Sequence, residues 1–222
     1  ICQKLEQPAA DGIYHLSYGM VELPTGKMKS REGTVVDADD LVDEMINISK
    51  EKTEALGKVS DFTSEQLTEL YNTIGLGALK FFLLRVDPKK KMIFNPEESI
   101  DFHGFTGPFI QYTHARIKSI LRKTGTTVDL TNNELLPLEK QLAIELSTFP
   151  AMVNEAAENL DPSKIAIYAF NLAKLFNTFY AEHSISNAES EIKKQLRIQL
   201  GILTAATLQK AMSALGIAVP EQ

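Results

Sequence analysis

From residue 106 onward, the chain consists of long segments in which apolar residues recur at helical spacing, separated by residues that favour helix starts. Strand patterns are almost absent from this half. Four helices are expected to open at Thr106-Gly107-Pro108, Pro137, Pro150 and Asp161-Pro162. A last helix is expected over 187–215, because Gly216 follows it and Pro220 lies just beyond. This half of the chain is therefore predicted to be a helical bundle.

The core of the predicted bundle consists of apolar residues that share the inward faces of these helices. They are Ile117, Ile120, Leu142, Leu146, Tyr168, Leu172, Leu175, Phe176, Phe179, Leu196 and Leu200.

The first half of the chain opens with a predicted strand at 13–23, where β-forming residues partly alternate with polar ones. A helix is expected over 37–56, and a second one behind the capping-box sequence at 63–66, continuing through 78–86. Asn95-Pro96 is expected to start a short helix. The fold class is accordingly mainly α.

Composition argues against several classes of protein. Cys2 is the only cysteine, so no intramolecular disulfide forms, and the four histidines lack metal-ligand spacing, so no metal site is expected. The single cysteine suits a reducing cytoplasm. The apolar runs are far shorter than a membrane span, which argues against a membrane role. The net charge of −6 argues weakly against a nucleic-acid partner, although local clustering of cations is hidden in a whole-chain sum.

The first candidate site is a stretch bracketed by Gly26 and Gly33 that holds the cations Lys27, Lys29 and Arg31. We expect an exposed, mobile, basic loop, because glycines and charges at this density suit neither a buried strand nor a packed helix. Such cations are suited to stabilising the negative charge of a phosphate chain. The alternative is a charged surface hairpin without function.

The second candidate site is the helix expected to begin near Pro108. No acidic residue occurs between Asp101 and Asp129, whereas four cations do: Arg116, Lys118, Arg122 and Lys123. Tyr112 precedes them, and an aromatic ring beside a cationic face is the combination that binds unstacked RNA bases. The alternative is that Tyr112 belongs to the core and the cations are a solvated face.

Two further basic groups are interpreted as solvated: the turn Lys89-Lys90-Lys91, and the face of the last helix with Lys193, Lys194 and Arg197 interleaved with glutamates. No catalytic triad or paired-carboxylate arrangement is evident, so hydrolysis is not supported.

The stretch MVELPTGKMKSREGTVV at 20–36 resembles the KMSKS-type signature region of class I aminoacyl-tRNA synthetases, in its arginyl form. The resemblance implies that Lys27, Lys29 and Arg31 are catalytic, and that Gly26, Met28 and Ser30 belong to the loop that closes over ATP. Ser30 stands where the second signature lysine would fall. Which cation meets the phosphates therefore stays open.

The stretch GPFIQYTHARI at 107–117 resembles the opening of the helical, DALR-type anticodon-binding domain of arginyl-tRNA synthetases. The stretches NTFY at 177–180 and LGIAVP at 215–220 resemble later parts of the same domain. The implied tRNA-binding residues are Gln111, Tyr112, Arg116, Lys118, Arg122, Lys123 and Tyr180.

Together these resemblances imply an arginine–tRNA ligase that uses ATP with Mg²⁺, L-arginine and tRNA-Arg. They imply three parts: the end of a Rossmann-type catalytic domain at 1–36, a helical connecting region at 37–105 and the anticodon-binding domain at 106–222. The family's HIGH-type motif and arginine pocket are not found in the sequence. We therefore expect a fragment that is inactive alone, holds no bound cofactor and is a monomer.

Two alternatives remain open from the sequence. One is another class I synthetase with a similar helical appendage, such as the cysteinyl type. The other is a non-catalytic helical interaction module, which would have neither a mobile basic loop nor a basic helix free of acids.

Overall fold

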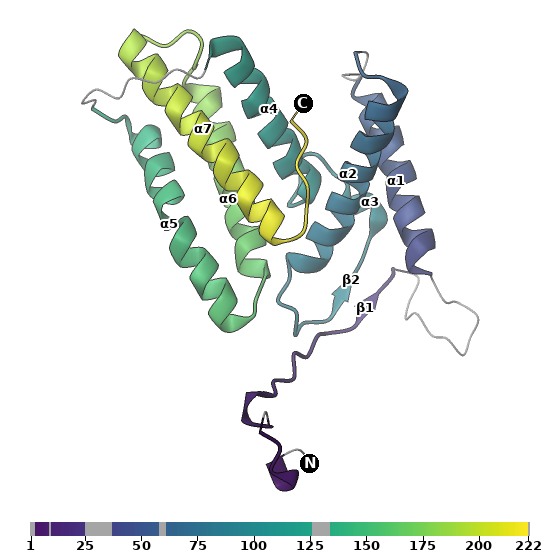
Figure 1. The fold of residues 1–222 in the computed structure, drawn as a ribbon. Coiled ribbons are helices and arrows are strands. Elements are labelled where there is room, and N and C mark those ends of the chain that lie inside the picture. The colour runs from purple at the N-terminus through teal and green to yellow at the C-terminus, as the bar shows by residue number, and fades with distance from the viewer. Residues whose placement is uncertain (1–2, 9, 25–36, 58–60, 126–133, 222) are drawn as a thin grey trace.

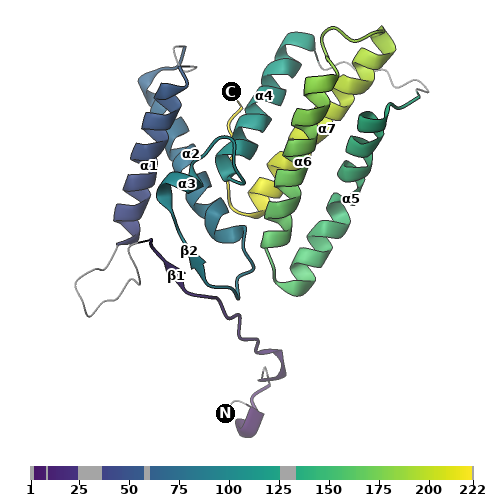
Figure 2. The ribbon, with the colours of Figure 1, turned by 180° about the vertical axis from the view of Figure 1, so that it is seen from behind.

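The structure, a computed structural model, describes residues 3–8, 10–24, 37–57, 61–125 and 134–221. A helical hairpin lies on one side of the molecule and a bundle of four helices on the other, as both views show (Figures 1 and 2). The described residues before the first strand lead away from this body and contain two short 3₁₀ turns, Gln3–Leu5 and Ala10–Gly12. Most of the described residues are helical, as the sequence predicts.

The hairpin consists of α1 (Ala38–Ala55) and α2 (Ser64–Leu84). The predicted capping box is confirmed, since the Gln66 N–H donates to the Thr63 hydroxyl at 3.3 Å and the Thr63 N–H donates to the Gln66 side chain at 2.9 Å. Gly75 lets the helices approach closely, because a Cβ there would lie 2.9 Å from the Met45 carbonyl oxygen. A small core forms around this contact; its buried members are Met45, Ile74, Ala78, Phe82, Phe94 and Ile100.

Beside the hairpin lies a two-stranded parallel sheet of β1 (Val21–Glu22) and β2 (Met92–Ile93). The strand predicted over 13–23 is therefore too long, because the regular pairing with β2 extends over Val21 and Glu22. Residues 13–18 are exposed. The predicted short helix is confirmed as α3 (Pro96–Ser99), with Asn95 capping it.

The bundle contains α4 (Gly107–Thr124), α5 (Pro137–Asn159), α6 (Ser163–Glu182) and α7 (Glu191–Ala214). The predicted core is confirmed, with Leu146, Leu175 and Leu196 partly buried against it and the other predicted residues buried. The helix stop at Gly216 is also confirmed, since this glycine has a φ of +68°. The last helix starts later than predicted, at Glu191, because Ser190 caps it.

The prediction that Pro150 opens a separate helix is wrong, because α5 continues through it. A proline inside a helix removes one backbone hydrogen bond and crowds the preceding turn. Here α5 packs along α6, and side-chain hydroxyls reach the preceding carbonyls: Thr148 and Tyr168 both donate to the Glu145 carbonyl, at 2.7 and 2.9 Å. The packing of α5 along α6 offsets the local cost.

The solvated face predicted for the last helix is also wrong for Lys193 and Arg197. Arg197 is 2% exposed, and it donates to the fully buried Glu139 at 3.0 Å and to Glu189 at 2.7 Å. Lys193 reaches the second oxygen of Glu139 at 2.7 Å. Burial alone would raise the pKa of Glu139, but the hydrogen bonds from Lys193, the Leu136 N–H and Arg197 outweigh burial and lower it. These pairs join α5 to α7.

Among the helices of the described residues, none combines the length and the apolar character that a membrane crossing requires.

Candidate nucleic-acid interface

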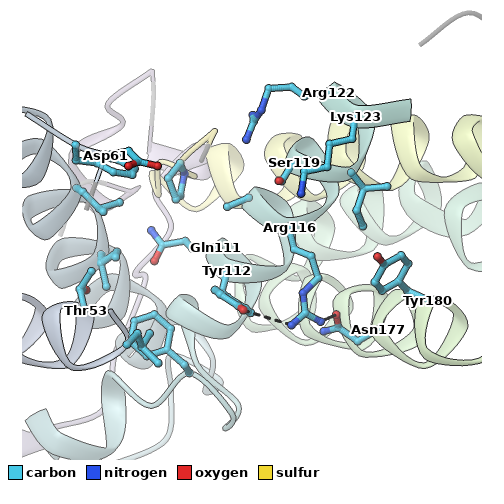
Figure 3. A pocket seen from close by; sticks show the side chains of 18 of the residues that line it. Thr53, Asp61, Gln111, Tyr112, Arg116, Ser119, Arg122, Lys123, Asn177 and Tyr180 are labelled. Carbon is cyan, nitrogen blue, oxygen red and sulfur yellow. Dashed lines mark hydrogen bonds between the residues drawn. The ribbon is translucent and has the colours of Figure 1, made fainter. Parts of the chain in front are cut away.

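A groove with a volume of about 1010 Å³ separates the hairpin from the bundle (Figure 3). Helices α4 and α6 supply one side, and α1, α2 and the residues that join them supply the other. Its aromatic lining residues are Phe62, Phe102, Tyr112 and Tyr180. Its charged lining residues are Asp61, Arg116, Arg122 and Lys123. The groove is thus apolar at its walls and mainly cationic along α4.

Helix α4 is held firmly at both ends, which fixes the side chains on its groove face. Thr106 caps it by accepting from the Phe109 N–H at 3.3 Å, and Gly125 ends it with a φ of +82°. Near its start it touches α2, since a Cβ on Gly107 would lie 2.7 Å from the Gly77 carbonyl oxygen. The cations of its last turn are favourably placed at the negative end of the helix dipole.

Tyr112, Arg116 and Asn177 form a connected group in the groove. The Arg116 guanidinium lies 5.0 Å from the centroid of the Tyr112 ring and donates to the Tyr112 hydroxyl at 3.4 Å. It also donates to the Asn177 side-chain oxygen at 3.3 Å, while the Asn177 amide donates to Thr113 at 2.9 Å. Figure 3 shows these side chains meeting between α4 and α6. The group orients a half-buried aromatic ring and a cation toward the same space.

Tyr180 adds a second aromatic ring from α6. Its ring is parallel to that of Phe176, with 6.2 Å between the centroids, and it is half-buried at the groove. Two tyrosines with their rings already held in place are suited to stacking on flat, apolar groups.

The structure brings together six of the residues that the sequence proposes for RNA: Gln111, Tyr112, Arg116, Arg122, Lys123 and Tyr180 all line the groove. Lys118 is not among the lining residues and pairs with Glu221 at 2.8 Å. Gln111 is 1% exposed, and its amide donates to the carbonyls of Thr73 and Ala218 at 3.0 and 2.8 Å. Both hydrogens of the Gln111 side-chain amide are therefore donated to carbonyls of the protein itself, and we do not include Gln111 among the residues that contact RNA.

The proposed ATP-loop residues, from Gly26 to Arg31, lie outside the described residues. In the turn Lys89-Lys90-Lys91, Lys91 pairs with Glu22 at 2.7 Å beside the small sheet. Within the described ranges, no group of three or more metal-binding side chains is gathered.

Apart from Tyr180, sequence reasoning missed the groove residues that come from outside α4. Asn177 belongs to the NTFY stretch, which was noted for its resemblance only. Thr53, Asp61 and Phe62 carry no signal in the sequence, because their place depends on how the hairpin packs beside α4.

Two family models match the chain. The model for the "DALR anticodon binding domain" matches residues 110–222, and the model for "tRNA synthetases class I (R), catalytic domain" matches residues 1–95. The first therefore covers α4 to α7, and the second covers the small sheet and the hairpin.

Curated relatives match over the whole length of the chain. The chain is 52% identical over 223 residues to a protein of Flavobacterium psychrophilum named arginine–tRNA ligase, covering 100% of this chain and 37% of that protein. It is 50% identical over 230 residues to a protein of the same name from Amoebophilus asiaticus, covering 100% and 38%. The chain thus spans little more than a third of the length of these relatives.

Solved structures share the fold. The arginyl-tRNA synthetase of Thermus thermophilus superposes with a TM-score of 0.83 at 31% identity, covering 93% of this chain and 35% of that one. The arginyl-tRNA synthetase of Plasmodium falciparum superposes with a TM-score of 0.69 at 23% identity, covering 84% and 34%, a likeness of fold alone.

Proposed function

The chain belongs to the arginyl-tRNA synthetase family, and from this premise we propose that it works within an arginine–tRNA ligase of the cytoplasm. Such an enzyme activates L-arginine with ATP and Mg²⁺ and transfers it to tRNA-Arg. The part formed by this chain contributes the signature loop of the ATP site and the domain that holds the anticodon arm. Its main contribution to the reaction is positioning of the tRNA.

The groove beside α4 is the observation that best supports RNA binding. Unstacked bases bind by stacking on aromatic rings, while nearby guanidinium and ammonium groups neutralise phosphates. Tyr112 and Tyr180 supply rings, and Arg116, Arg122 and Lys123 supply cations along one side of the same groove. The acid-free sequence of α4 gives this side a local positive charge within a chain whose net charge is −6.

For the signature loop, the support is the sequence of residues 26–31 and the match of the catalytic-domain model over residues 1–95. Lys27, Lys29 and Arg31 would stabilise the charge that develops on the leaving pyrophosphate. Gly26, Met28 and Ser30 would form the backbone of the loop over ATP.

Neither alternative function is favoured. The relatives that cover the whole chain are named arginine–tRNA ligase, not the cysteinyl enzyme. A purely structural interaction module would not need a groove that gathers cations and tyrosines.

A salt titration tests the RNA proposal. We expect the chain to bind a tRNA-Arg transcript more tightly than an unrelated tRNA, with affinity that falls as salt rises. For three cations meeting phosphates of an unstacked loop, the slope of log affinity against log salt concentration is about −2. Equal affinity for both tRNAs together with no salt dependence contradicts the proposal and favours the interaction module.

The matched variants are Tyr112→Ala and Tyr18→Ala. Loss of one base stack is expected to weaken binding of Tyr112→Ala by about 1 to 3 kcal/mol. Tyr18 is 83% exposed and belongs to the segment that precedes the small sheet, so Tyr18→Ala makes the same chemical change away from the groove and should bind like wild type. Unchanged affinity of a folded Tyr112→Ala variant removes Tyr112 from the interface.

A further inference from the structure

The segment that follows α7, residues 216–221, lies against α4 and α2; we call it the tail. Figure 1 shows it turning back from α7 and running beside α4. The turn is set by Gly216, whose φ is +68°, and by a hydrogen bond of 2.9 Å from the Ile217 N–H to the Met212 carbonyl. Beyond this turn the tail has no regular secondary structure, so side chains of other elements must hold it.

Gln111 makes the first of these contacts from inside the protein. Its amide nitrogen donates to the Ala218 carbonyl at 2.8 Å and to the Thr73 carbonyl of α2 at 3.0 Å. The amide passes directly over Gly77, where a Cβ would lie 2.4 Å from the same nitrogen. Gln111 therefore joins α4, α2 and the tail, and this junction requires glycine at position 77.

His114 makes the second contact, one turn further along α4. It is fully buried, and its Nδ1 lies 2.8 Å from the Pro220 carbonyl oxygen. Because a carbonyl can only accept, Nδ1 donates. The Nε2 atom is buried and has no hydrogen-bond partner among the described residues. Outside this contact, Arg122 donates to the Glu221 carbonyl at 2.8 Å, and Lys118 pairs with the Glu221 carboxylate at 2.8 Å.

The tail also belongs to the groove, since Pro220 and Gln111 both line it together with Tyr112 and Arg116. Resting on the proposed RNA-binding function, we propose that Gln111 and His114 are positioning residues that hold the tail as a wall of the groove. A chain segment without secondary structure loses much entropy when it is ordered. The two buried donors order it before RNA arrives, so RNA binding does not have to supply that free energy.

The hydrogen bonds from Gln111 and His114 to the tail are together called the anchor. Gly77→Ala is the sharpest test of it, because this substitution displaces Gln111 without altering any residue that meets RNA. The new methyl group displaces the Gln111 amide, which is the end of a flexible side chain, while alanine favours the interior of α2. We expect the variant to fold, with a moderate loss of stability from the two displaced hydrogen bonds, and to bind a hairpin RNA with the anticodon arm of tRNA-Arg about fivefold or more weakly. Gly12→Ala is the matched control, since a Cβ there has nothing within 4 Å.

Gln111→Leu and His114→Leu remove one donor each, whereas His114→Asn keeps a donor near the place of Nδ1. We expect both leucine variants to bind the hairpin about fivefold or more weakly and His114→Asn to bind nearly as well as wild type. Side-chain methyl order parameters of Ala218 and Val219, measured by NMR, are expected to fall in Gly77→Ala and in both leucine variants, and to stay high in His114→Asn.

The outcomes separate the two proposals. A wild-type chain that does not distinguish this hairpin from an unrelated one contradicts the RNA proposal itself. If wild type distinguishes them, the anchor is overturned by variants with a loosened tail and unchanged affinity, and equally by variants with weakened affinity and a tail as ordered as in wild type.

Discussion

At the scale of single residues, His114 is the buried group whose protonation is most consequential. Burial lowers its pKa from the usual 6.5, and the nearby Lys118 lowers it further, whereas the hydrogen bond to Pro220 and the charge of Glu221 raise it. The pKa is therefore lower in the folded chain than in the unfolded chain. A second proton would go to Nε2, which is buried without a partner in the described structure.

We predict that His114 makes the folded chain less stable in mild acid. Below pH 6.5 the unfolded chain takes up the proton first, so stability falls with pH until the folded pKa is passed, by at most about 1.4 kcal/mol per pH unit. Urea unfolding at pH 7.5 and at pH 5.5 measures this loss. His114→Asn cannot titrate and should lose less stability between the two pH values. An identical loss in both proteins would show that another group is responsible.

Residue identities alone did not show which way neighbouring side chains point. Gln111 and Tyr112 are adjacent in sequence and were both predicted to meet RNA, yet one residue of a helix is turned by about 100° from the next. Tyr112 reaches the groove, whereas Gln111 points between α2 and the tail. The sequence indicated the chemistry of this helix, and the packing of α2 decided which face stays open.

At the scale of whole elements, the ion pairs between α5 and α7 replace apolar packing at one end of the bundle. Glu139 is fully buried and also caps α5, since it accepts from the Leu136 N–H at 2.9 Å. Arg197 holds the other oxygen. A buried pair of this kind contributes little when compared with a well-packed apolar pair, but removal of Arg197 leaves the Oε1 atom of the buried Glu139 without a donor, and only Lys193 then balances its charge.

We predict that Arg197→Met destabilises the chain by about 3 to 5 kcal/mol. The double variant Arg197→Met/Glu139→Leu should recover much of that loss, because the buried carboxylate and guanidinium are removed together and the remaining Lys193, whose side chain is 15% exposed, can turn to water. Lys194→Met is the matched control on the same helix, and a change within about 0.5 kcal/mol is expected because Lys194 makes only a surface pair. Free energies of unfolding from urea titration provide the measurement. A mild single variant, or a double variant that is worse, would contradict this account.

Helix starts were predictable from the sequence where a cap acts locally. Thr63, Asn95 and Thr106 cap the helices expected behind them, because a cap depends on residues within one turn. Pro150 misled the prediction, since a proline favours a helix start in isolation but is tolerated inside a helix that is packed along its length. The length of strand β1 was mispredicted for a similar reason, because it depends on pairing with β2, which is distant in sequence.

At the scale of the whole molecule, two cores face each other across the groove. One lies between the hairpin and the small sheet, and the other lies inside the bundle. The mainly helical class and the residues of the larger core were predictable from periodicity. The groove was not predictable, because it forms where the hairpin packs beside the bundle. No local sequence pattern in either part indicates how the two pack together.

We predict that the signature loop and the groove act on separate steps of the proposed reaction. In the full-length enzyme, Lys27→Ala and Lys29→Ala should each slow arginyl-adenylate formation about tenfold or more, as the loss of a transition-state contact does. Neither should change affinity for the anticodon-arm hairpin. Pyrophosphate exchange and hairpin titration measure the two steps. Wild-type exchange in both variants would remove these lysines from the mechanism.

The two buried donors of α4 hold the tail by its main-chain oxygens alone. Every amino acid offers the same oxygen, so a substitution at position 218 or 220 keeps the acceptor that each hydrogen bond uses. Those side chains are thereby free to differ between related enzymes. The side chains that the tail places beside a bound nucleotide can therefore change during evolution, while the hydrogen bonds from Gln111 and His114 are kept.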